Sequence, residues 1–216
     1  VGFDALTANT TGHSNVAMGT NSLLACTTGD QNVAIGMDAL KTITGANDNV
    51  AIGREALRDN TANDNVGIGE EALKLNSSGT NNTAVGKHAL NVNTTASENT
   101  AVGSLSLDAN TTGAANTASG YLALTANTTG SSNSAFGKDS LSANTTGNAN
   151  VAVGKDALKA NTTADNNTAV GIDAMTVNTT GYDNVAVGRN ALDANVGGHS
   201  NTALGESSLT SNTEGD

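Results

Sequence analysis

Charged side chains are the residues of this chain whose type and spacing could do chemistry. One acidic-leaning column recurs about every 17 residues, and stacked carboxylates in such a column could bind calcium as a ladder. Leu105 and Leu122 interrupt the column, and the dense Gly-Gly-x-Gly-x-Asp pattern of calcium-binding repeats is absent. We therefore predict no dedicated metal site, with weak calcium binding as the alternative. The column contains Asp4, Asp38, Glu55, Glu71, Asp139, Asp156 and Asp173.

All nine basic residues fall in two columns close to the acidic one. Like charges stacked ~4.8 Å apart repel each other unless counter-charges lie between them. We predict that the neighbouring columns supply these counter-charges, at roughly 0–1 kcal/mol per exposed pair. The first basic column contains Arg54, Lys87, Lys138, Lys155 and Arg189, and the second contains Lys41, Arg58, Lys74 and Lys159.

Other reactive side chains form no recognisable constellation. His13, His88 and His199 are widely separated, and we interpret them as solvated side chains. Cys26 is the only cysteine, so it cannot form an internal disulfide. Val-Gly-Lys-Asp lacks the spacing of a phosphate-binding loop. We predict a protein that is not an enzyme, with no catalytic residue and no cofactor.

Composition excludes several partners and folds. The net charge is -11, which disfavours nucleic acids and anionic membrane surfaces. No stretch approaches the ~20 apolar residues that cross a bilayer, so we expect no membrane insertion. With four aromatic residues and no Trp, the chain cannot build a globular core of ordinary thickness. The alternatives are disorder or a thin stack, and strict residue columns argue against disorder.

Glycine marks the period of the repeat that positions these columns. Successive glycines lie 17 residues apart, except for one interval of 16 between Gly53 and Gly69. Such a period predicts an all-β parallel β-solenoid of about 13 coils, forming a single domain over 1–216 that is open at both ends. The chain begins and ends within a repeat, so we expect a piece of a longer chain or copies that stack end to end. The column contains Gly2, Gly19, Gly36, Gly53, Gly69, Gly86, Gly103, Gly120, Gly137, Gly154, Gly171, Gly188 and Gly205.

Asparagine occupies the first position of every complete repeat. Identical Asn side chains can hydrogen-bond up and down a stack, so we predict a structural Asn ladder. The column contains Asn15, Asn32, Asn49, Asn65, Asn82, Asn99, Asn116, Asn133, Asn150, Asn167, Asn184 and Asn201.

Two short strands and two corners are predicted in each repeat. Val or Thr, then Ala, then Val or Ile precede the glycine, which predicts a strand whose second and fourth positions share one face. The near-invariant Ala implies that a neighbouring sheet or chain approaches its face closely. The Ala-Leu pair that follows is interpreted as a second short strand, with Leu filling the core beside Val, Ile and Asn. Asn-Thr-Thr-Gly is a surface turn with a threonine ridge, and its N-x-Thr sequons, such as Asn9, Asn93 and Asn161, are interpreted as chance matches.

The motif Asn-x-Ala-Val/Ile-Gly resembles the head repeat of the YadA-like trimeric autotransporter adhesins. Asn32 to Gly36 and Asn49 to Gly53 carry the likeness, which recurs in phase along the whole chain, although the usual repeat of that family is near 14 residues. The 17-residue form is similar to repeats in phage tail-fibre-like and bacterial surface proteins. This resemblance implies a left-handed parallel β-roll, a parallel homotrimer and an adhesive or fibre role at the cell or virion surface.

The function that these features favour is an extracellular structural or adhesive fibre segment. It would be a rigid, non-catalytic spacer whose partners are copies of itself and possible host-surface or matrix ligands. A phage tail-fibre shaft is one alternative, and an ice-binding solenoid that uses the threonine-rich turns is another. A polysaccharide-cleaving spike would need paired carboxylates and aromatic platforms, for which four aromatic residues are too few.

Overall fold

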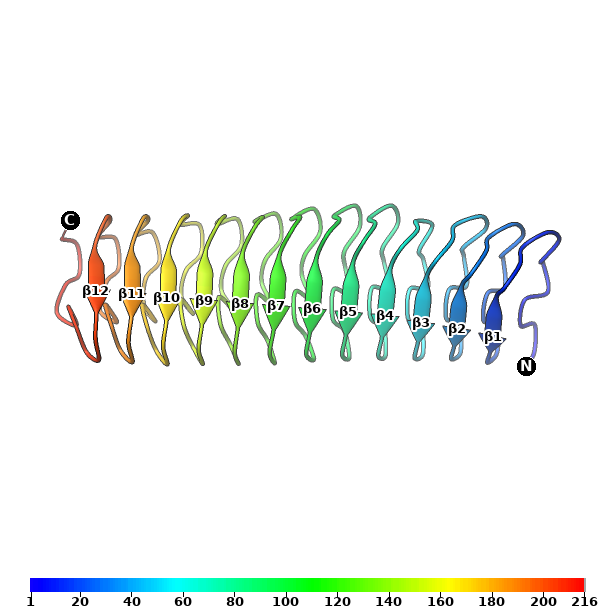
Figure 1. The fold of residues 1–216 in the computed structure, drawn as a ribbon, viewed down its shortest axis with the longest axis horizontal. Helices are drawn as coiled ribbons and strands as arrows, with labels where there is room; N and C mark the ends of the chain where they lie inside the picture. The colour runs from blue at the N-terminus through cyan, green and yellow to red at the C-terminus, as the bar shows by residue number, and fades with distance from the viewer. Residues whose placement is uncertain (216) are drawn as a thin grey trace. The chain divides into compact units, whose positions relative to one another are not determined.

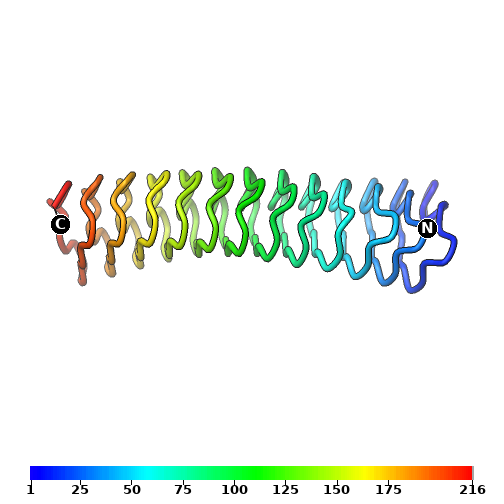
Figure 2. The backbone as a smooth tube through the Cα atoms, turned by 90° about the horizontal axis from the view of Figure 1, so that it is seen from above, coloured from blue at the N-terminus to red at the C-terminus, as the bar shows by residue number. Residues whose placement is uncertain are grey.

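The computed structural model describes residues 1–215. The chain divides into two compact units, Val1–Thr112 and Gly113–Asp216, each of which is described separately below. Both units are built from similar coils that follow one another along the chain (Figures 1 and 2). Among the described residues there are strands, turns and bends but no helix.

Each complete repeat contributes one three-residue strand, directly before its glycine. Within each unit, neighbouring strands lie side by side, parallel and in register, so that Val33 faces Val50 and Ala34 faces Ala51 (Figure 1). The first unit contains β1 (Val16–Met18), β2 (Val33–Ile35), β3 (Val50–Ile52), β4 (Val66–Ile68), β5 (Thr83–Val85) and β6 (Thr100–Val102). The second contains β7 (Thr117–Ser119), β8 (Ser134–Phe136), β9 (Val151–Val153), β10 (Thr168–Val170), β11 (Val185–Val187) and β12 (Thr202–Leu204).

This architecture confirms the predicted all-β parallel β-solenoid with a 17-residue repeat. It has about 11 turns rather than the 13 coils expected from the glycines. The difference arises at the first repeat, because Gly2 comes before any strand in residues 1–215. The left-handed sense of the coil stays a prediction.

Alanine, and not Val or Ile, is the strand residue that points into the interior. Ala34, Ala51 and Ala84 are fully buried, whereas the residues on either side of each are partly or largely exposed. The predicted Val/Ile column of the core is therefore wrong. These side chains alternate with the inward Ala and cover the outer face of the strands.

Leucine fills the interior and explains why the inward strand residue must be small. The described coils bury one large side chain each at this position, among them Leu40, Leu57 and Met175. At Gly67, where the repeat lacks its Ala, an added Cβ would lie 3.1 Å from Leu57 Cγ and from the Ala72 carbonyl oxygen. The close approach thus comes from the chain's own leucine and backbone, which overturns the expectation of a neighbouring sheet or chain on this side.

The predicted second strand is wrong, because the Ala-Leu segment curls into turns. Asp38 and Leu40 both have positive φ, at 57° and 49°, and Ala39 N–H donates to the Gly36 carbonyl at 3.4 Å. A left-handed residue bends the chain away from an extended path. Coil-to-coil bonding nevertheless continues through this segment, since Leu40 N–H donates to the Ala56 carbonyl at 3.1 Å.

Left-handed backbone recurs at three positions in almost every described repeat. The first is the acidic-leaning column, the second is the buried Leu, and the third directly precedes the ladder Asn. Asp and Asn tolerate this conformation better than most residues, which accounts for their frequency in the first and third columns. The acidic column therefore reflects backbone geometry as well as charge.

Candidate functional site

The predicted Asn column lies in the interior, where its side chains bond to backbone and to one another. Asn49 N–H and Asn49 Nδ2 both donate to Asn32 Oδ1, each at 3.1 Å. Asn32 Nδ2 in turn donates to the Ala46 carbonyl at 2.9 Å. The same pattern recurs at Asn133 and Asn150 in the second unit. Each coil is thereby tied to the next by side-chain bonds that exclude water.

A second buried Asn ladder runs through the Asn-Thr-Thr-Gly corners. Asn93 Nδ2 donates to Asn76 Oδ1 at 2.8 Å and to the Ala96 carbonyl at 3.0 Å. Sequence reasoning treated these asparagines as turn residues, although their recurrence at one place in the repeat was a signal equal to that of the first column. The column contains Asn9, Asn60, Asn76, Asn93, Asn110, Asn127, Asn144, Asn161, Asn178, Asn195 and Asn212.

This burial accounts for the sequons at the corners. Asn93 and Asn161 are fully buried, and their side-chain nitrogens donate to carbonyl oxygens and to the neighbouring ladder Asn. A glycan on these nitrogens would require the corner to open, so the folded coil shields them from modification.

Side-chain oxygens two positions before the ladder Asn make a third set of coil-to-coil bonds. Asp30 N–H donates to Asn47 Oδ1 at 2.7 Å, and Ser131 N–H donates to Asn148 Oδ1 at 2.9 Å. This position is largely filled by Asp, Asn, Ser and Thr, each of which can supply the acceptor. The sequence reasoning missed it because the residue type varies while the acceptor oxygen is preserved.

The glycine column is required by backbone contact between coils. Gly154 has φ of 135°, and an added Cβ would lie 2.4 Å from the Gly171 carbonyl oxygen. Gly36 is similar, with φ of 136° and 2.3 Å to the Gly53 carbonyl oxygen. Both the positive φ and the missing space exclude other residues.

The outer strand face is the broadest apolar surface on each unit. We give this name to the second and fourth positions of the repeat, which flank the inward Ala. Within β1–β12, these positions carry Val, Ile, Thr, Ser, Met, Phe and Leu and no charged residue. Val16, Val102 and Val153 are 44%, 41% and 38% exposed, so the face has no cover in the single chain.

Threonine hydroxyls differ between this face and the corners. The first Thr of the corner donates its hydroxyl to the next coil, as Thr10 Oγ1 does to the Thr27 carbonyl at 3.0 Å and Thr145 Oγ1 to that of Thr162 at 3.0 Å. Half of the predicted threonine ridge is therefore committed to holding coils together.

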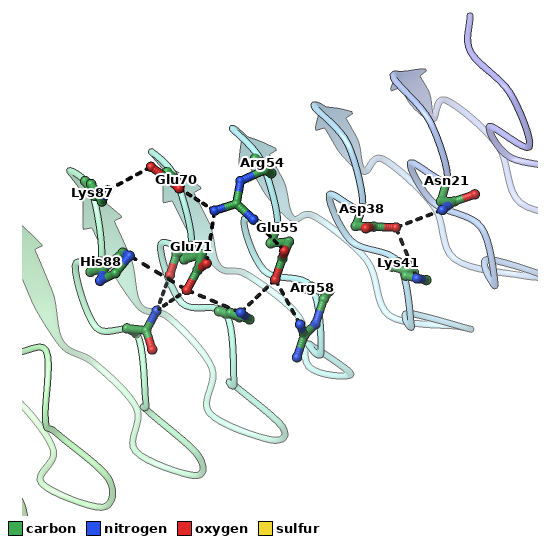
Figure 3. A network of polar contacts seen from close by, with 12 residues as sticks. Asn21, Asp38, Lys41, Arg54, Glu55, Arg58, Glu70, Glu71, Lys87 and His88 are labelled. Carbon is green, nitrogen blue, oxygen red and sulfur yellow. Dashed lines mark hydrogen bonds and ion pairs between the residues drawn. The ribbon is translucent and has the colours of Figure 1, made fainter.

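Charged columns in the first unit form a connected network beside the strands (Figure 3). Arg54 bonds to Glu70 of the next coil and to Glu55 of its own coil, the latter at 2.7 Å. Lys74 Nζ lies 2.7 Å from Glu55 Oε2 and 3.2 Å from Glu71 Oε2. Opposite charges thus alternate between coils, as predicted.

The network lowers the pKa of its carboxyl groups. Hydrogen bonds from Arg54 and Lys87 lower the pKa of Glu70 to about 2. A hydrogen bond from Lys74 is the main cause that lowers the pKa of Glu55. Asp108 shows the reverse, because burial raises its pKa more than the charge of His88 lowers it.

The remaining candidate residues lie apart. His88 Nε2 lies 3.7 Å from Glu71 Oε2, and His199 stacks on Tyr182 with ring centroids 4.7 Å apart. Cys26 is buried, and burial raises the pKa of its thiol. Across residues 1–215 there is neither a cavity nor a group of three His, Cys, Asp or Glu side chains arranged to hold a metal ion.

Comparisons with known proteins assign no family. No protein-family model, no curated protein and no solved structure matches the chain. The described part of the chain also lacks any helix with the length and apolar character needed to span a membrane. The candidate functional site is therefore defined by geometry alone, as the outer strand face with the charged columns beside it.

Proposed function

We propose that this chain is a non-catalytic segment of an extracellular fibre at a cell or virion surface. It acts as a rigid spacer and adhesive surface, and it assembles with copies of itself as a homotrimer. The observation that carries the proposal is the uncharged, uncovered outer strand face, which repeats in register in both units.

The outer strand face supports self-association because it is apolar and regular. Parallel strands are usually covered on both faces, and here the chain covers only the inner one. Val, Ile and Thr stand at the same height in each coil of a unit, so a second copy meets a repeating surface. Contiguous exposed apolar surface of this kind marks interaction sites in soluble proteins.

Charge beside the face favours copies whose axes point the same way. The exposed position just before the ladder Asn carries Asp48, Asp64, Glu98 and Asp183 and no basic residue. The position after the glycine, across the strand, carries Arg54, Lys87, Lys138, Lys155 and Arg189, with two glutamates. When two faces meet with parallel axes, the acidic edge of one copy lies against the basic edge of the other. Antiparallel axes would bring like edges together, at a cost in affinity and specificity.

Among the alternatives, the shaft of a phage tail fibre has the same physical basis and differs only in where the fibre is found. Ice binding through the threonine-rich turns finds less support, because the first corner threonine already donates its hydroxyl to the next coil.

The experiment is to measure the mass of the purified chain in solution and to test the face with matched variants. We expect a particle of three times the 21.3 kDa chain mass, elongated in electron micrographs. Val153→Asp places a charge on the outer strand face, and Val177→Asp places one on an apolar residue of similar exposure outside it, 38% against 41%. The first variant should dissociate the trimer, and the second should leave it intact.

A monomeric wild-type chain at micromolar concentration would contradict the proposal. Equal behaviour of the two variants would contradict the assignment of the face, even if the chain is a trimer.

A further inference from the structure

One corner of the first unit lacks the coil-to-coil bonds that the others make. In the regular pattern, both residues after the corner's first position donate their N–H groups to one carbonyl of the next coil. Thr27 and Thr28 N–H donate to the Thr44 carbonyl at 2.9 and 3.1 Å. Thr44 and Gly45, one coil later, make no such bond among the described residues. Both are exposed, so their N–H groups face solvent.

The shortened repeat is the cause of this gap. The coil that follows has 16 residues, and Ala62 comes directly after Thr61 at the place where a second corner Thr would stand. Asn60 Nδ2 therefore bonds to the Ala62 carbonyl, only two residues ahead, at 2.7 Å. The corner of this coil is tighter, and the Thr61 carbonyl accepts no bond from the preceding coil.

Ile43 removes two further bonds from the same corner. It replaces an asparagine of the second ladder, so it cannot donate a side-chain bond to the Gly45–Ala46 turn or to the neighbouring coil. Its N–H also makes no bond to the Leu40 carbonyl, whereas Cys26 and Asn60 make the equivalent turn bonds at 3.2 Å. Side-chain and backbone bonds are thus lost at one place.

The rest of the junction between these two coils is intact. β2 and β3 pair in register, and Asn47 N–H donates to Asn63 Oδ1 at 2.9 Å. Leu40 N–H also donates to the next coil, as described above. The weakness is therefore confined to the corner at residues 42–46.

We infer that the corner at residues 42–46 is a built-in opening point, at which the solenoid exposes its backbone before any other corner of the first unit. Local opening follows from few buried contacts and missing backbone bonds. Such a point lets the stack yield or be cut at one corner while the adjoining coils keep their pairing. It does not depend on the proposed fibre function, because it concerns the folded chain alone.

Limited trypsin digestion of the whole chain tests the inference, with Lys159 as a matched internal control. Lys41 and Lys159 occupy the same position of the repeat, and each pairs with an Asp three residues earlier, at 3.1 and 3.0 Å. The Lys41 side chain is 36% exposed and that of Lys159 49%, so exposure alone favours cleavage after Lys159. We expect cleavage after Lys41 to be at least about tenfold faster, because opening and not exposure sets the rate.

A repaired variant separates the missing bonds from other causes. Insertion of a threonine after Thr61, together with Ile43→Asn, restores the regular corner and should slow cleavage after Lys41 to the rate after Lys159. Amide exchange in the wild-type chain gives a second measurement, in which Thr44 and Gly45 should exchange at least about tenfold faster than Thr94 and Thr95. Faster cleavage after Lys159, or protection of Thr44 equal to that of Thr94, would overturn the inference.

Discussion

Cys26 occupies the place, one coil after Asn9, from which an asparagine would donate to the Asn9 side chain. Asn9 Oδ1 is consequently buried without a hydrogen-bond partner, although Asn9 Nδ2 still donates to the Gly12 carbonyl at 3.0 Å. Cys26 substitutes only weakly, with Sγ 3.7 Å from the Gly29 carbonyl oxygen. The second Asn ladder thus ends at its N-terminal side in an unsatisfied acceptor.

The contrast between Asn9 and an asparagine within this ladder yields the first prediction. Asn144→Ala removes the donor to Asn127 Oδ1, the acceptor of Asn161 Nδ2 and the donor to the Gly147 carbonyl, at 2.9, 2.9 and 3.0 Å. We expect a loss of about 3 kcal/mol in unfolding free energy, since each orphaned buried group costs roughly 1–3 kcal/mol. Asn9→Ala removes one bond and one unsatisfied acceptor, and it should cost about 1 kcal/mol or less. Urea denaturation measures both, and equal losses would argue against the ladder as a source of stability.

The second prediction concerns the glycine column and has an internal control at its end. Gly154→Ala would place its Cβ against the Gly171 carbonyl oxygen and force a residue with a Cβ to keep φ of 135°. Gly205 shares the positive φ, at 118°, but nothing lies within 4 Å of its added Cβ. We expect Gly154→Ala to lower the unfolding free energy by more than about 3 kcal/mol and Gly205→Ala by about 1–2 kcal/mol, the cost of backbone strain alone. Thermal unfolding of both variants would show whether contact between coils adds to that strain.

Strict columns were enough to predict a parallel stack with a 17-residue period, because a solenoid places like residues together. They could not show which strand residues point inward. Val and Ile were assigned to the core on hydrophobicity, yet Leu57 leaves room only for Ala34 or its equivalents on the inner face. The second strand was predicted because Ala-Leu repeats. Left-handed φ at Leu40 is a feature that neither leucine nor its spacing reveals.

Among the candidate sites, the Asn and Gly columns could be located from the sequence alone. The outer strand face could not, since its definition depends on which side of the strand is buried. The opening point at residues 42–46 was visible only as a one-residue deletion near Ile43, and its missing bonds follow from the geometry of the corner.

A third prediction follows from the left-handed position before the ladder Asn. Ala149 is exposed there with φ of 54°, a conformation that costs a residue with a Cβ roughly 1–2 kcal/mol. Ala149→Gly should therefore raise the unfolding free energy by about 1 kcal/mol, against the usual trend for glycine. Ala160→Gly is the control, because Ala160 has no positive φ and should lose about 0.5–1 kcal/mol from added chain entropy. Denaturation midpoints of opposite sign for the two variants would bear this out, and a loss in both would contradict it.

The charged network gives the last prediction, a dependence of stability on pH. The pKa of Glu70 is lowered to about 2, from about 4.3 for an ordinary Glu. A carboxylate with a lowered folded pKa stabilises the fold fully above its unfolded pKa and loses that contribution as pH falls. Stability should therefore fall between about pH 5 and pH 2, as Glu70 and, in the same direction, Glu55 become protonated.

Glu70→Gln removes the pairs with Arg54 and Lys87, so it should reduce stability at pH 7 and weaken the decline on acidification. Glu98→Gln is the control, since Glu98 makes no ion pair within residues 1–215 and its loss should leave the decline unchanged. Urea midpoints at pH 7 and pH 3 measure the effect for the three chains. Added salt at pH 7 should narrow the gap between wild type and Glu70→Gln, because exposed ion pairs are screened. A Glu70→Gln chain that declines as steeply as the wild type would assign the acid sensitivity to other carboxylates.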